Sequence, residues 1–157
     1  MNKAMLVLGV VLVAAVSVTK LRSTDTIAPA TDDDLVLDRI WMDHIPRHDK
    51  DIFQVFVALT EQPFGVFQAS SQWQGNYEIF RYEAHGGELR IIYPQSNQRE
   101  QVKSTARRCN EQGMDYCLEL EGSSRGVKRY YSKKGWEIDG DLATARVKVE
   151  ALAHQNR

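Results

Sequence analysis

The sequence predicts a mainly all-β domain: an antiparallel meander of about eight strands that closes into a barrel and is followed by a C-terminal helix. Short strand-like runs recur between residues 35 and 133, and turn-forming residues separate them. Most connections have hairpin length, which favours antiparallel neighbours. The apolar pattern changes to a helical period only near the C-terminus. Closure of so long a sheet also removes its two exposed edges.

Length and composition fit one small domain. The chain has 157 residues, of which 43% are hydrophobic and 26% are charged, as in an ordinary globular protein. The formal net charge is -1, so no global positive field attracts phosphate backbones. Nucleic acid is therefore not expected as a partner.

The N-terminus predicts export. Lys3 precedes an apolar run over Ala4–Val16, a pattern typical of a secretory signal and shorter than the ~20 residues of a usual spanning helix. Residues 1–18 are predicted to be a cleaved signal peptide or an uncleaved helical anchor, and both alternatives stay open. We expect an extracytoplasmic protein (periplasmic, secreted or membrane-anchored) that meets a membrane only through this segment. Residues 19–34 are polar and predict a flexible linker.

Eight strands are predicted in the remainder, which forms a domain over residues 35–153. The strands are Leu35–His44, Ile52–Thr60, Phe64–Trp73, Asn76–Ala84, Glu88–Tyr93, Gln98–Cys109, Tyr116–Glu121 and Val127–Lys133. Ile52–Thr60 has the clearest alternation of the eight. Gly86 and Gly87 predict a tight hairpin turn between the fourth and fifth strands.

A helix is predicted over Asp141–Ala153, packed on the outside of the barrel. Its apolar face carries Leu142, Ala145, Val149 and Leu152. The β-branched residues within Arg146–Glu150 leave a strand as the alternative.

Two cysteines predict a disulfide. Cys109 and Cys117 enclose a polar segment around Gly113, which is typical of a hairpin. The residues that share the cysteines' faces are Lys103, Thr105 and Arg107 on the first strand, and Glu119 and Glu121 on the second. We therefore predict a surface cross-strand bridge, which stabilises by roughly 2–3 kcal/mol in the chain-entropy model. Free thiols and a redox-active pair are the alternatives, and the latter usually has Cys-x-x-Cys spacing.

Three local features, together with the strand count, resemble the lipocalin (calycin) family. Trp41 lies in the first strand, where that family keeps a tryptophan at the barrel floor. Lys128 or Arg129, in the last strand, is similar to the basic residue that covers this tryptophan. Met114–Tyr116 is similar to a Thr-Asp-Tyr segment of the family. The family's glycine two residues before the tryptophan is Arg39 here, and Met114 stands in place of the threonine.

The resemblance and an excess of aromatic residues together predict a ligand site. Barrels of this size either are filled by side chains or hold one small ligand. The predicted ligand-binding residues are Trp41, Phe53, Tyr77, Tyr93, Tyr116 and Arg129. The alternative is that the aromatic residues simply form the core.

Other candidate sites have simpler interpretations. Asp43–Asp49 contains four metal-ligand side chains, but Pro46 argues against a helix that aligns them, so we interpret it as a polar loop. Arginines such as Arg81, Arg90 and Arg99 alternate with glutamates, which is typical of a solvated face. The sequence has no nucleophile elbow, phosphate loop or dinucleotide fingerprint, so no catalytic residue and no cofactor is predicted.

The leading functional hypothesis is an exported envelope or periplasmic barrel that binds a small apolar or amphipathic ligand. The second is a non-catalytic structural or protein-interaction module with a filled barrel, whose partner is another envelope protein. The third is an enzyme on the same scaffold. An enclosed apolar cavity favours the first, a filled axis with an exposed apolar patch the second, and converging polar groups with shifted pKa values the third.

Overall fold

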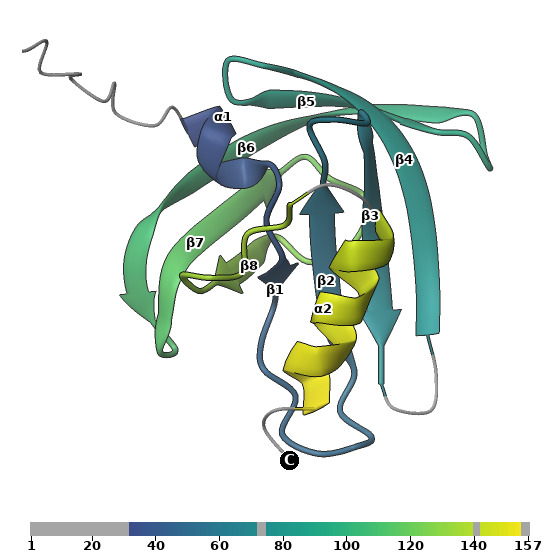
Figure 1. Ribbon diagram of the computed structural model, residues 1–157. Helices are drawn as coiled ribbons and strands as arrows, with labels where there is room; N and C mark the ends of the chain where they lie inside the picture. Colours follow the sequence, from purple (N-terminus) through teal and green to yellow (C-terminus); the bar gives the residue numbers. More distant parts are fainter. Residues whose placement is uncertain (1–31, 72–74, 140–141, 155–157) are drawn as a thin grey trace, which may run out of the picture.

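The computed structural model describes residues 32–71, 75–139 and 142–154, and it contains a closed antiparallel barrel (Figure 1). The strands are β1 (Trp41–Met42), β2 (Phe53–Ala58), β3 (Phe64–Ser70), β4 (Gly75–His85), β5 (Glu88–Tyr93), β6 (Gln98–Glu111), β7 (Met114–Glu121) and β8 (Arg129–Ser132). Helix α1 (Asp32–Val36) precedes them and α2 (Leu142–His154) follows. Each strand pairs with the next, and β8 pairs with β1, so the predicted eight-stranded meander barrel is confirmed.

The predicted first strand is wrong over most of its length. Leu35–His44 was expected to be extended, but α1 ends at Val36 and only Trp41 and Met42 form β1. Asp38 explains the difference, because its positive φ of 50° breaks the extended path and its carboxylate accepts hydrogen bonds from Thr60. The last three residues of the predicted linker therefore begin a helix. The predicted signal or anchor segment lies outside the described residues.

Two hairpins have the turn geometry that their sequences demand. Gly86 and Gly87 both have positive φ, and so do Gln112 and Gly113. Each pair is the two-residue connection of a hairpin, since His85 pairs with Glu88 and Glu111 with Met114. Positive φ at both central residues is the requirement of a type I′ turn.

Aromatic side chains fill the barrel axis. Alternate residues of the strands face inward and bury six phenylalanine and tyrosine rings, namely Phe56, Phe67, Phe80, Tyr82, Tyr93 and Tyr130. Neighbouring ring centroids lie 5.1–6.2 Å apart. Phe80 lies over Gly65, where an added Cβ would be 2.1 Å from the Phe80 ring. The packing of the core therefore requires glycine at position 65.

A second apolar cluster covers part of the barrel from outside. Phe53, Val55 and Val57 of β2 face away from the axis and cluster with Ala145 and Val149 of α2. Figure 1 shows α2 lying along the outer side of β2 and β3. The predicted helix and its position are confirmed, and β2 is buried on both faces. In the described residues neither helix combines the length and apolar character needed to cross a membrane.

The disulfide joins Cys109 and Cys117, whose Cα atoms lie 5.7 Å apart. The predicted pairing of the two cysteines is confirmed, and both lie on the outer face of their strands, as predicted. The predicted surface exposure is wrong, because Cys117 is buried in the outer cluster and Cys109 is half-buried against it. A register shift between Arg108 and Glu111 accompanies the bridge.

Candidate functional site

The structure does not bring the six predicted ligand-binding residues together. Trp41 and Tyr116 lie at the α1 end of the barrel, and Tyr93 lies in the core. Phe53 is buried in the outer cluster under α2, Arg129 lies on the outer surface, and Tyr77 lies at the rim of the opposite end. We call the α1 end the floor and the opposite end, which carries Gln54 and Asn76, the mouth. Their joint role as a ligand site stays a prediction.

The predicted cover of Trp41 is wrong. Lys128 is exposed, and Arg129 pairs with Glu119 on the outer surface. Arg39 takes that place, with its guanidinium 6.0 Å from the centre of the Trp41 ring and 4.2 Å from that of Tyr116.

The floor is closed. Trp41 Nε1 donates a hydrogen bond to the Val36 carbonyl of α1 at 2.9 Å. Arg39 is itself buried, donates to the Lys133 carbonyl at 3.1 Å, and pairs with Glu137 at 2.6 Å. Both α1 and the segment after β8 are therefore fixed across this end, which gives the floor a structural role.

The mouth has a polar wall that follows from strand register. Gln54 of β2 lies opposite Ala69 of β3, and Ala69 lies opposite Asn76 of β4. All three face inward, because they alternate with the outward residues of their strands. The small Ala69 leaves space between two longer side chains that end in amides. The row below it, towards the floor, contains Phe67 and Glu78.

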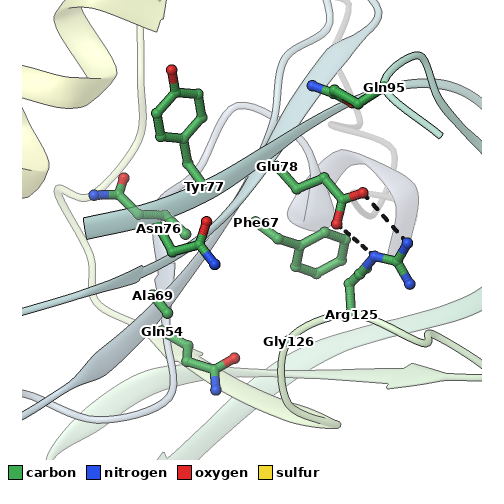
Figure 2. Close-up of a pocket in the computed structure, with 10 residues that line it drawn as sticks. Gln54, Phe67, Ala69, Asn76, Tyr77, Glu78, Gln95, Arg125 and Gly126 are labelled. Carbon is green, nitrogen blue, oxygen red and sulfur yellow. Dashed lines mark hydrogen bonds and ion pairs between the residues drawn. The ribbon is translucent and has the colours of Figure 1, made fainter. Parts of the chain in front are cut away.

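A hollow of about 370 Å³ occupies this space (Figure 2). Its lining residues are Gln54, Phe67, Gln68, Ala69, Asn76, Tyr77, Glu78, Gln95, Arg125 and Gly126. Figure 2 shows Phe67, Glu78 and Arg125 converging on one side of it, with the Gln54 and Asn76 amides on another. Tyr77 belongs to the outer face of β4 and is 67% exposed. The hollow is thus a recess with a mixed polar and apolar lining above the aromatic core.

The connection between β7 and β8 lies across the mouth. Gly122 and Gly126 in this loop have φ of 87° and 64°. At Gly126 an added Cβ would lie 2.0 Å from Tyr130 Oη, so no other residue fits without movement. The Val127 N–H donates to the same oxygen at 3.0 Å. The loop is held close to the core at this point.

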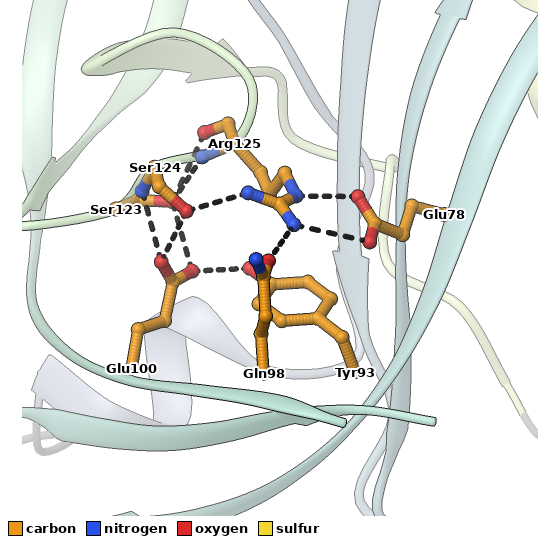
Figure 3. Close-up of polar contacts among 7 residues, drawn as sticks. All are labelled: Glu78, Tyr93, Gln98, Glu100, Ser123, Ser124 and Arg125. Carbon is orange, nitrogen blue, oxygen red and sulfur yellow. Dashed lines mark hydrogen bonds and ion pairs between the residues drawn. The ribbon is translucent and has the colours of Figure 1, made fainter. Parts of the chain in front are cut away.

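Arg125 inserts from this loop into a polar network (Figure 3). Its Nε donates to Glu78 at 2.5 Å and its Nη2 to Gln98 at 2.5 Å. Its guanidinium carbon lies 4.6 Å from the centre of the Tyr93 ring. The hydrogen bond to Glu78 raises the pKa of Arg125. The loop is therefore fastened to β4 and β6 through one side chain.

Glu100 forms the second half of the network. The Tyr93 hydroxyl donates to it, as do the Ser124 N–H at 2.9 Å and the Ser124 hydroxyl at 2.7 Å. Burial opposes ionisation of Glu100, but these hydrogen bonds outweigh it and lower its pKa. Burial, followed by the hydrogen bond to Glu100, raises the pKa of Tyr93. At neutral pH a carboxylate thus accepts from a protonated phenol.

The polar mouth was not predicted from the sequence. The prediction that the glutamates belong to a solvated face is wrong for Glu78, because it faces inward and pairs with Arg125. Gln54, Asn76 and Arg125 were not singled out, although the first two occupy inward positions of their strands. A polar residue on the apolar side of an alternating strand was the available signal. No such signal exists for Arg125, because it lies in a loop, where the sequence has no alternation that predicts which way a side chain points.

Two further groups carry side chains of the types that ligate metals. His44 lies between two carboxylates, with Nδ1 3.0 Å from Asp43 and Nε2 3.3 Å from Asp51. These contacts stabilise the loop between β1 and β2, which is polar, as predicted. In the described part of the chain, one ligand-like group gathers within metal-binding distance, namely Cys109, Glu111 and Cys117. Its two sulfurs are joined as the disulfide, so they are not thiolate ligands in this state.

The mouth therefore combines a recess, amide and charged groups, and a covering loop, whereas the floor and axis are filled. The barrel matches the architecture that the lipocalin resemblance implies, and membership of that family does not follow from architecture alone. Searches of family models, curated proteins and solved structures find no match for this chain.

Proposed function

We propose that this chain is an exported, extracytoplasmic β-barrel module that binds a small amphipathic ligand at the mouth. The observation that carries the proposal is the recess of about 370 Å³ between Gln54, Asn76 and Arg125. Its size falls in the range of small-molecule sites. The disulfide supports an oxidising compartment, because such bridges persist mainly outside the cytosol.

The ligand is amphipathic rather than purely apolar. Six aromatic rings occupy the axis, so an apolar ligand inside the barrel would have to displace the core. The recess instead offers an apolar base at Phe67 and Ala69 beneath polar groups. Of the residues predicted from sequence, Tyr77 lies at its rim and Tyr93 lies below it under Arg125.

Filling the recess tests the proposal. Ala69→Phe places a ring between Gln54 and Asn76 and should abolish retention of any small molecule. Gln101→Phe, an exposed position of β6, is the matched control and should retain it. The measurement is native mass spectrometry of each full-length protein purified from its own envelope, with thermal unfolding to verify the fold. Equal retention by a folded Ala69→Phe variant would refute the mouth as the site.

The second candidate is a protein-interaction module, favoured by a groove of about 440 Å³ on the outer surface beside α2. The groove has an apolar wall formed by Val55, Val57, Val66, Ile79, Ala145 and Val149. The same mass spectra distinguish the two candidates. Retention of a second polypeptide, with no small molecule, would favour the interaction module.

A further inference from the structure

We propose that the mouth recognises an uncharged sugar ring. This inference rests on the proposed function and names the chemical class of its ligand. It depends on three properties of the recess: its charge balance, its unpaired amides and its small apolar base.

The charged groups of the mouth already satisfy one another. Glu78 pairs with Arg125 at 2.5 Å, and Glu100 accepts hydrogen bonds from Tyr93 and Ser124. An anionic ligand would have to displace Glu78 from Arg125, and a cationic ligand would have to displace Arg125 from Glu78. Breaking such a charge-assisted contact opposes the binding of either ion. The electrostatics therefore favour a ligand without net charge.

The neutral polar groups remain available. In the described part of the chain, the side-chain amides of Gln54, Asn76 and Gln95 make no hydrogen bond with the protein, whereas the Gln68 amide donates to Ser70 at 2.5 Å. Each free amide offers both a donor and an acceptor group. Adjacent hydroxyls of a sugar likewise donate and accept, so one amide can bind two of them. A ligand with a single polar group would leave most of these amides without a partner.

The base of the recess suits the carbon-bound hydrogens of a ring. Ala69 contributes one methyl group, and Phe67 beneath it is 5% exposed. One face of a pyranose is apolar, so it can lie on this surface while its hydroxyls point to the wall. A volume of about 370 Å³ lies at the small end of ligand sites and limits the occupant to about one or two rings.

The experiment is a titration of the full-length protein with defined sugars, followed by ligand-observed NMR and calorimetry. The probes are glucose, galactose, mannose and N-acetylglucosamine, with glucosamine and glucuronic acid as charged counterparts. We expect saturable binding of at least one neutral sugar, and binding of the amino sugar and the uronic acid of the same configuration at least about tenfold weaker. Saturable binding of none of the four neutral sugars, or equal binding of the charged forms, would overturn the inference.

Matched variants locate the binding. Asn76→Ala and Gln54→Ala should each weaken binding of the neutral sugar about tenfold, the usual effect of losing paired hydrogen bonds. Gln101→Ala removes an exposed amide from the outer face of β6 and should leave the affinity unchanged. Equal affinity in all three folded variants would place the sugar elsewhere and reject the inference.

The two proposals can fail separately. If native mass spectrometry finds a small molecule that Ala69→Phe abolishes, and no sugar binds, then the mouth is a ligand site and the sugar class is wrong. If no small molecule is retained and no sugar binds, both proposals fail.

Discussion

The two ends of the barrel use the same components for different purposes. Arg39 at the floor lies over Tyr116 and pairs with Glu137, and Arg125 at the mouth lies over Tyr93 and pairs with Glu78. The side chain of Arg39 is 7% exposed, whereas that of Arg125 is 26% exposed. The buried guanidinium of Arg39 therefore has a structural role, whereas a ligand can approach the more exposed guanidinium of Arg125.

The supporting elements explain this contrast. At the floor, Arg39 belongs to the chain between α1 and β1 and donates to a backbone carbonyl after β8. At the mouth, Arg125 belongs to a loop between positive-φ glycines and bonds mainly to side chains. Displacing Arg39 would expose the core to solvent. Displacing Arg125 would only enlarge a recess that is already present.

Removing each arginine gives the largest predicted difference. Arg39→Ala should lower the free energy of unfolding by about 3 kcal/mol, mainly through lost packing on Tyr116 and Trp41, because the Glu137 side chain is about half exposed to solvent. Arg125→Ala should cost about 1 kcal/mol or less, as expected of a solvent-accessible pair. Urea unfolding of both variants measures the difference. Equal losses would remove the structural distinction between the ends.

Removing the disulfide tests the floor in another way. The bridge lies near the β6–β7 hairpin, at the floor end of the barrel. Cys109→Ala/Cys117→Ala should lower the free energy of unfolding by about 2 kcal/mol, because only a short loop is released in the unfolded chain and alanine adds no polar group to the outer cluster. The side-chain amide NMR signals of Gln54 and Asn76 should not move. Large shifts of those signals would show that the ends are coupled.

The parent protein supplies the control for this experiment. Thiol titration should find no free cysteine before reduction and two after it, since the structure pairs Cys109 with Cys117. Two reactive thiols in the untreated protein would contradict the bridge.

The barrel could be predicted from the sequence because alternation and turn chemistry are local signals. Glu88–Tyr93 was predicted with the bounds that β5 has, since a two-glycine turn and a strict alternation define it. The first strand was predicted too long, because the positive φ of one residue, Asp38, breaks the extended path. A positive φ at a residue other than glycine has only a weak sequence signal.

The site was harder to predict because it depends on pairing across strands. Ala69 creates a recess only because the register places it between Gln54 and Asn76. Likewise, Arg39 covers Trp41 from two residues away, whereas the resemblance implied a residue of the last strand. Register and loop position are tertiary properties, so composition and periodicity along one strand do not specify them.

The smallest predicted effect is a difference between the mouth and the floor in how pH and salt change the stability of the fold. The pKa values of Glu100 at the mouth and Glu137 at the floor are both lowered in the folded state. Each carboxylate therefore stabilises the fold above its unfolded pKa, and that contribution is lost as the pH falls through the folded value. Glu100→Gln and Glu137→Gln should each reduce the acid dependence of the urea midpoint between pH 7 and pH 3.

Salt then distinguishes the physical causes of the two pKa shifts. Hydrogen bonds from Tyr93 and Ser124 counter the burial of Glu100, and ionic screening affects such contacts little. Burial of Glu137 is countered first by a hydrogen bond from its own backbone N–H and then by the charge of Arg39. Because Glu137 is 47% exposed, salt screens the contribution of Arg39. The effect of Glu137→Gln should therefore shrink at high salt, while that of Glu100→Gln should persist. If the Glu100→Gln effect also vanished, the mouth carboxylate would be held by long-range charge rather than by its hydrogen bonds, and Arg125 would be its main partner.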